Sequence, residues 1–122
     1  MPPRSRVMTP ADIEQRYLVL SKELDEAYQE LEDAEYAFHT TKSEYELALA
    51  RTRLDLIRNT SVKMTVGERE DEALSRCADE RRELGANEAR VRAARGNVSR
   101  IQVQVDLARS MGTSIRTAMD LS

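Results

Sequence analysis

The sequence predicts an all-α protein built as a long antiparallel two-helix hairpin that resembles a coiled coil. Charged residues make up 34% of the 122 residues, while tryptophan is absent and glycine and proline are scarce, a composition typical of long helices. Apolar residues recur at alternating spacings of four and three in two long segments. We therefore expect a flexible basic arm over residues 1–8 and a single domain over 9–122, with helices over 10–59 and 66–119 and a loop over 60–65.

The first helix has a clear start signal and one apolar seam. Thr9 is a good N-cap, Pro10 suits the first helical position, and Asp12 complements the helix dipole. From there an uncharged seam follows the 4,3 spacing: Ile13, Tyr17, Leu20, Leu24, Ala27, Leu31, Ala34, Phe38, Thr41, Tyr45, Ala48 and Thr52. Near the end of this helix the apolar face widens, taking in Leu47, Leu49, Leu54, Leu56 and Ile57.

The second helix begins with a capping box, in which Thr65 is followed three residues later by Glu68. Its seam reads Ala73, Cys77, Glu80, Leu84, Asn87, Val91, Ala94, Val98, Ile101, Val105, Ala108, Gly112, Ile115 and Met119. The short connection predicts that the two helices fold back on each other. Charge supports this hairpin, because residues 11–46 hold eleven acidic and three basic side chains, while residues 89–119 hold six arginines and one aspartate.

The stretch IQVQVDL, residues 101–107, alternates apolar and polar residues and by itself would indicate a β-strand. The helical spacing continues on both sides, so we expect helix, with Val103 and Leu107 pointing away from the seam. A helix that is apolar on two faces needs two partners, and the second must come from another chain. The sequence therefore predicts a homo-oligomer, with an interface drawn from Leu49, Leu56, Ile57, Val103, Leu107 and Met111.

Two positions in the second helix are expected to be special. The sequence SMGTS around Gly112 predicts a kink or a break, and a break there could leave a short C-terminal helix, because glycine costs about 1 kcal/mol in a helix interior. Asn87 lies on the seam, where a buried asparagine could set the register of the helices. It could equally be exposed at a place where the seam frays.

Catalysis finds little support in the sequence. His39 is the single histidine and has no cysteine or second histidine at ligand spacing, so we expect it to be a solvated surface residue. Cys77 lies on the seam, where a thiol serves as a small apolar filler. The glycines are isolated and form no phosphate-binding loop. We expect no enzyme activity, no cofactor and no metal site.

Basic residues gather near the expected tip of the hairpin and are candidates for binding nucleic acid. This basic tip cluster consists of Arg51, Arg53, Arg58, Lys63, Arg69 and Arg76. A second group at the open end includes Arg4, Arg6, Arg16, Arg109 and Arg116. The net charge of −3 argues against a generic duplex DNA binder, but an oligomer would repeat either patch and strengthen its local field. Ordinary solubilising arginines are the alternative.

The sequence also predicts where the protein works. No stretch approaches the roughly 18 apolar residues of a membrane-spanning helix, and no cationic start followed by an apolar run marks a secretory signal. A single cysteine cannot form an intrachain disulfide. We therefore expect a cytoplasmic protein with no membrane partner, in the host cell if a phage encodes it.

Three stretches resemble small helical phage proteins grouped with the UvsY-type recombination mediators: AYQELEDAEYAFHTTKSEYELALARTRLDL, MTVGEREDEAL and LARSMGTSIRTAM. Together they span roughly residues 25–119. The resemblance implies a non-enzymatic accessory factor that oligomerises, binds single-stranded DNA, and helps a recombinase or annealing protein displace the single-strand-binding protein. The alternative is a structural or adaptor coiled coil that acts through protein contacts alone, which the uncharged seams and the second apolar face favour.

Overall fold

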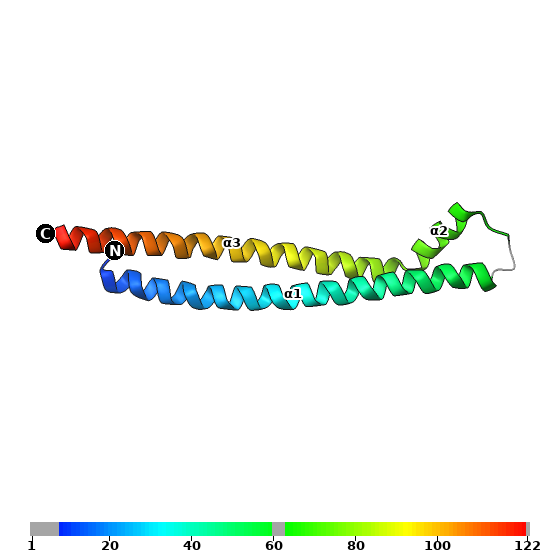
Figure 1. The fold of residues 1–122 in the computed structure, drawn as a ribbon, viewed down its shortest axis with the longest axis horizontal. Helices are drawn as coiled ribbons and strands as arrows, with labels where there is room; N and C mark the ends of the chain where they lie inside the picture. Colours follow the sequence, from blue (N-terminus) through cyan, green and yellow to red (C-terminus); the bar gives the residue numbers. More distant parts are fainter. Residues whose placement is uncertain (1–7, 60–62, 122) are drawn as a thin grey trace, which may run out of the picture. The chain divides into compact units, whose positions relative to one another are not determined.

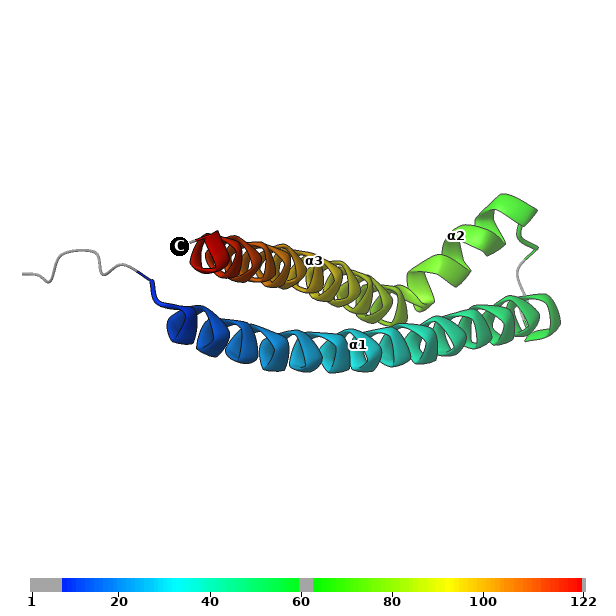
Figure 2. The ribbon, with the colours of Figure 1, turned by 60° about the vertical axis from the view of Figure 1, so that its left-hand side comes forward.

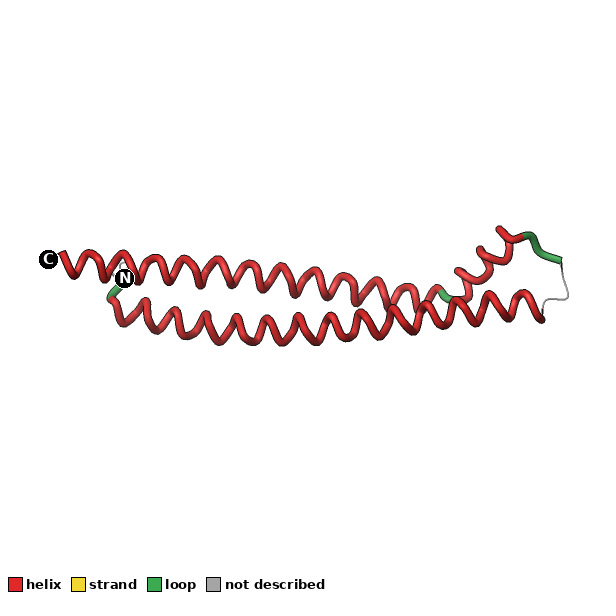
Figure 3. Tube along the Cα trace, viewed as in Figure 1, coloured by secondary structure: helices red, strands yellow, loops and turns green. Residues whose placement is uncertain are grey.

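The computed structural model describes residues 8–59 and 63–121, and within these ranges every regular element is a helix (Figure 3). Helix α1 spans Pro10–Asn59, α2 spans Val66–Arg76 and α3 spans Ala78–Leu121. The all-α prediction and the bounds of the first helix are confirmed. Residues 63–65 of the expected loop are not helical, whereas residues 60–62 and residues 1–7 of the expected arm lie outside the described residues.

The predicted caps form as hydrogen-bonded pairs. The Asp12 amide donates to Thr9 Oγ1 at 3.2 Å, and the Thr9 amide donates to Asp12 Oδ2 at 3.0 Å. At α2, Thr65 Oγ1 accepts from the Glu68 amide at 3.1 Å. These contacts satisfy backbone donors that have no partner in the first turn of a helix, which explains why both helices begin where the sequence predicts.

The chain divides into two compact units, and α1 and α3 each contribute to both. The first unit consists of residues 1–30 and 94–122, where α3 lies antiparallel beside α1 (Figures 1 and 2). Its core consists of seam residues from both helices that are buried against one another: Leu20, Ala27, Ile101, Val105 and Ala108. Tyr17, Leu24 and Val98 are partly buried and pack against this core. Both seams are thus confirmed as the contact face of this unit.

The stretch 101–107 lies within this first unit and is helical throughout. Ile101 and Val105 are buried in the core, while Val103 and Leu107 are exposed. The alternation therefore marks two faces of one helix, as predicted.

The second unit consists of residues 31–93. One core cluster joins Leu49 and Leu56 of α1 to Ala73 and Cys77, with Tyr45 and Ala48 packed against it. A polar contact lies elsewhere on the same seam. Asn87 Nδ2 donates to Thr41 Oγ1 at 3.1 Å and reaches the Ala37 carbonyl oxygen at 3.5 Å. Asn87 is therefore in the helix contact and not exposed in a frayed end.

The predicted break at Gly112 is wrong, because α3 continues to Leu121. Gly112 is half-buried on the seam, where its backbone approaches Ile13 closely enough that an added Cβ would lie 3.6 Å from that side chain. Packing along the seam outweighs the intrinsic cost of one helical glycine.

The second helical segment is instead interrupted at Cys77, between α2 and α3. Cys77 has φ −100° and ψ 17°, outside the helical region, although its amide still donates to the Ala73 carbonyl at 3.1 Å. Figures 1 and 2 show that α2 leaves the direction of α3 at this point. The interruption changes the direction of the chain while Ala73 and Cys77 both remain in the core beside α1.

Candidate association surface

The five large apolar residues near the end of α1 divide into two sets. Leu49 and Leu56 are only 8% and 4% exposed and belong to the core of the second unit. Leu47, Leu54 and Ile57 are 50%, 45% and 63% exposed. The prediction that Leu49 and Leu56 lie at an interface between chains is therefore wrong, since contacts within the hairpin already cover them. Ile57 is exposed, as that prediction requires.

The exposed members of this group belong to a longer repeat on α1. We call it the outer stripe, and it consists of Tyr36, Thr40, Ser43, Leu47, Ala50, Leu54 and Ile57. Every member is exposed and none is charged. Each lies two or five residues beyond a seam residue, which is about 200° or 140° around a helix, so the stripe faces away from the seam. Leu47 and Leu54 were not among the interface residues predicted from the sequence, although the sequence shows the second 4,3 repeat to which they belong.

In the first unit, α3 carries a smaller exposed apolar face. Val103 and Leu107 are 67% and 60% exposed, and Met111 is also exposed. All three were predicted interface residues, and the structure leaves them open to a partner. A contiguous exposed apolar face is typical of a binding surface, whereas an isolated exposed leucine is not.

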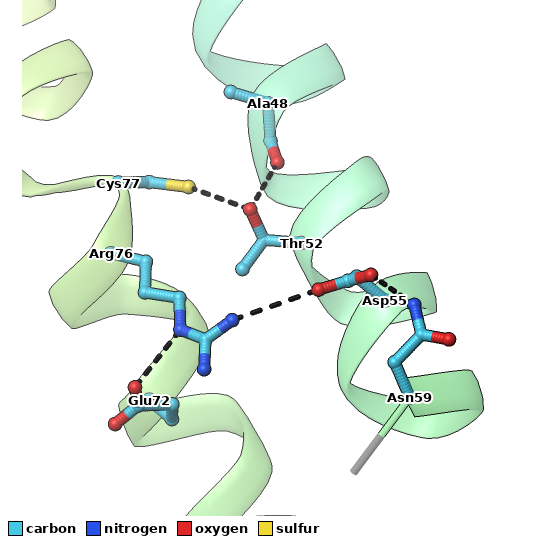
Figure 4. Close-up of polar contacts among 7 residues, drawn as sticks. All are labelled: Ala48, Thr52, Asp55, Asn59, Glu72, Arg76 and Cys77. Carbon is cyan, nitrogen blue, oxygen red and sulfur yellow. Dashed lines mark hydrogen bonds and ion pairs between the residues drawn. The ribbon is translucent and has the colours of Figure 1, made fainter.

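Two of the six cations of the basic tip cluster, Arg53 and Arg76, lie against carboxylates. Arg53 Nε donates to Glu70 Oε2 at 2.9 Å, and Arg53 Nη2 makes a second contact with the same carboxylate at 2.5 Å. Arg76 lies between two acids, with Glu72 Oε1 2.9 Å from Nε and Asp55 Oδ2 3.7 Å from Nη1 (Figure 4). The predicted basic surface is thus a mixed-charge surface.

The contact with Arg53 also lowers the proton affinity of the Glu70 carboxyl. The hydrogen bond from Arg53, aided by its charge, lowers the pKa of the Glu70 carboxyl below its usual value. Both side chains are well exposed, so solvent screens the pair. Four cations of the cluster make no ion pair within the described residues: Arg51, Arg58, Lys63 and Arg69.

A groove of about 580 Å³ lies between α1 and α3 in the first unit, lined among others by Tyr17, Arg109 and Arg116. The guanidinium carbon of Arg109 lies 5.9 Å from the centre of the Tyr17 ring. Hydrogen bonding from Arg109, with its charge, lowers the pKa of the Tyr17 hydroxyl. Of the open-end basic group, Arg109 and Arg116 line this groove, whereas Arg4 and Arg6 lie outside the described residues.

Of the two residues considered for catalysis or metal binding, His39 lies on the surface and Cys77 lies in the core. His39 is exposed, with its ring centre 5.2 Å from that of Phe38. Cys77 is buried, and its sulfur lies 3.5 Å from Thr52 Oγ1, which also donates to the Ala48 carbonyl (Figure 4). Over residues 8–59 and 63–121, no group of three or more His, Cys, Asp and Glu side chains could hold a metal ion. None of the helices in those ranges is long and apolar enough to cross a membrane.

Protein-family models, curated proteins and solved structures offer no match to this chain. A function for this chain is therefore inferred from its fold and from its exposed surfaces.

Proposed function

We propose that the chain is a non-enzymatic helical-hairpin protein that works as a structural scaffold or adaptor, and that its copies associate through outward-facing apolar faces. The observation that carries the proposal is the outer stripe of α1, in which Leu47, Leu54 and Ile57 stay exposed while the neighbouring leucines are buried. Val103 and Leu107 on α3 are a second such face. A thin two-helix core buries little apolar surface, so association supplies the rest of the stabilisation.

Multi-angle light scattering on the purified chain tests this proposal. The wild type is expected to be larger than one chain at tens of micromolar, and L47K/L54K or V103K/L107K to be closer to a single chain. Circular dichroism should show that both variants keep most of their helicity, because the seams are unchanged. S75K/T113K adds the same two charges at exposed positions outside both faces and should keep the wild-type mass. A monomeric wild type would refute the proposal.

A second candidate is a phage recombination mediator that binds single-stranded DNA and helps to load a recombinase or annealing protein. It is supported by the tip cations that no carboxylate neutralises, above all the exposed Arg51, Arg58 and Lys63. Self-association would bring several such sets together and raise the local positive potential. Against it stands the near balance of charge over residues 51–76, which hold six basic and five acidic side chains.

Fluorescence anisotropy with a single-stranded oligonucleotide tests this candidate. R51A/K63A is expected to weaken binding at low salt. It should also make the negative slope of log K against log salt shallower by about 1.4, because two phosphate contacts are lost. R92A/R100A removes two arginines of α3 that lie outside the cluster and should bind like the wild type. No binding of the wild type at low salt would eliminate direct contact with DNA.

A further inference from the structure

The outer stripe of α1 could be covered by a second copy of this chain or by another protein. Its spacing and the charges beside it favour a second copy in one orientation. All of these residues lie in the second unit of the chain, on one continuous helix. Their relative positions therefore follow from helix geometry alone.

Charges flank the outer stripe on both sides and change sign along it. On one side Glu44 is followed by Arg51 and Arg58, and on the other Glu46 is followed by Arg53. Both flanks are thus acidic near Ser43 and basic near Ile57. A parallel partner would gather the acidic ends at one end of the contact and the basic ends at the other. An antiparallel partner places acidic against basic on both flanks.

We propose that two copies pair antiparallel through their outer stripes, about a twofold axis at Ala50. This inference rests on the association proposed above and names its partner, orientation and register. In this register Leu47 faces Leu54 of the other copy and Ser43 faces Ile57. Such a contact is isologous, the commonest kind of interface in homo-oligomers.

The same register defines the charged contacts. Glu44 lies opposite Arg58 of the other copy, and Glu46 lies opposite Arg53, although Arg53 already binds Glu70 within its own chain. The pair of Glu44 and Arg58 is thus the cleaner probe, since neither side chain makes an ion pair within the described part of its own chain. Arg51 lies opposite Arg51 of the other copy near the twofold axis. Both side chains are exposed, so they can point away from each other into solvent.

Cysteine cross-linking tests the register, with Cys77→Ala as the parent of every variant. A50C is expected to form disulfide-linked dimers under mild oxidation. L47C and L54C should cross-link poorly alone but efficiently when mixed, because equal positions lie about 10 Å apart along the axis, too far for a disulfide. A89C, an exposed position on α3 of the same unit, should give no dimer.

A charge exchange tests the same register with the native cysteine in place. E44R and R58E should each weaken dimerisation in sedimentation equilibrium by about tenfold, since each breaks two symmetric ion pairs and creates repulsion. The double variant E44R/R58E should recover the wild-type dissociation constant. No recovery would overturn the antiparallel register, because only that register brings the two positions together.

The outcomes separate this inference from the proposed function. If L47C and L54C cross-link alone as well as A50C does, the pairing is parallel, and the inference falls while association stands. If the wild type associates but no outer-stripe cysteine cross-links, the contact lies elsewhere, and again only the inference falls. A wild type that is monomeric would overturn both.

Discussion

Replacing Leu20 with alanine is expected to lower the free energy of unfolding by about 3 kcal/mol. Leu20 is 1% exposed and lies in the core of the first unit, packed among seam residues of both helices. The substitution removes apolar surface from that core and leaves a cavity that two long helices cannot readily close. Urea unfolding followed by circular dichroism at one fixed protein concentration measures the change.

Leu18→Ala is the matched control, because it makes the same change on the same helix at a position that is 58% exposed. Its effect is expected to stay within about 0.5 kcal/mol, as for most surface substitutions. Equal effects of the two substitutions would contradict the assignment of the seam as the core of this unit. The protein concentration must match between samples, since association adds to the apparent stability.

Replacing Ala73 with leucine is expected to release α2 from the second unit. The Ala73 side chain is fully buried with Leu49, Leu56 and Cys77, so the larger side chain overpacks the site at a cost of about 1–3 kcal/mol. At 11 residues α2 is too short to be stable without packing. Hydrogen exchange of the α2 amides should therefore become much faster, while exchange of the Leu20 region should stay unchanged.

Ala78→Leu serves as the comparison, since it makes the same substitution at an exposed position just beyond the interruption at Cys77. Its α2 amides should exchange at the wild-type rate. Slow exchange in α2 of the Ala73→Leu variant would mean that the core beside α1 has room for a leucine, contrary to the packing described for this unit.

The candidate surface was only partly predictable from the sequence. Val103, Leu107 and Ile57 were correctly placed on exposed faces, because each lies far from the seam in helical spacing. Leu49 and Leu56 were misplaced. Beyond Tyr45 the buried leucines are Leu49 and Leu56, each one residue beyond the position that the 4,3 spacing of the seam predicts, so the contact face turns by about one residue relative to the seam. That turn accompanies the change of direction at Cys77. No proline or glycine, the residues that usually signal a break, lies next to Cys77 in the sequence.

The charged tip shows the same limit. A sequence presents Arg53 and Arg76 simply as two of six cations, yet each lies against a carboxylate of another helix, Glu70 in one case and Asp55 in the other. Partners 17 and 21 residues apart in the chain meet only because α2 folds back on α1. The hydrogen-bonded contact of Asn87 with Thr41, 46 residues away, depends on the folded pairing in the same way.

By itself the sequence determined the helical class, the start of each helical segment and the two seams, because caps and hydrophobic period depend on neighbours within a few residues along the chain. Only the tertiary structure decided that the second segment is interrupted at Cys77 and not at Gly112. It alone also decided which leucines near the end of α1 turn inward and which arginines are neutralised. These outcomes depend on where the second helix lies against the first, and that position is set by the summed packing of many distant side chains.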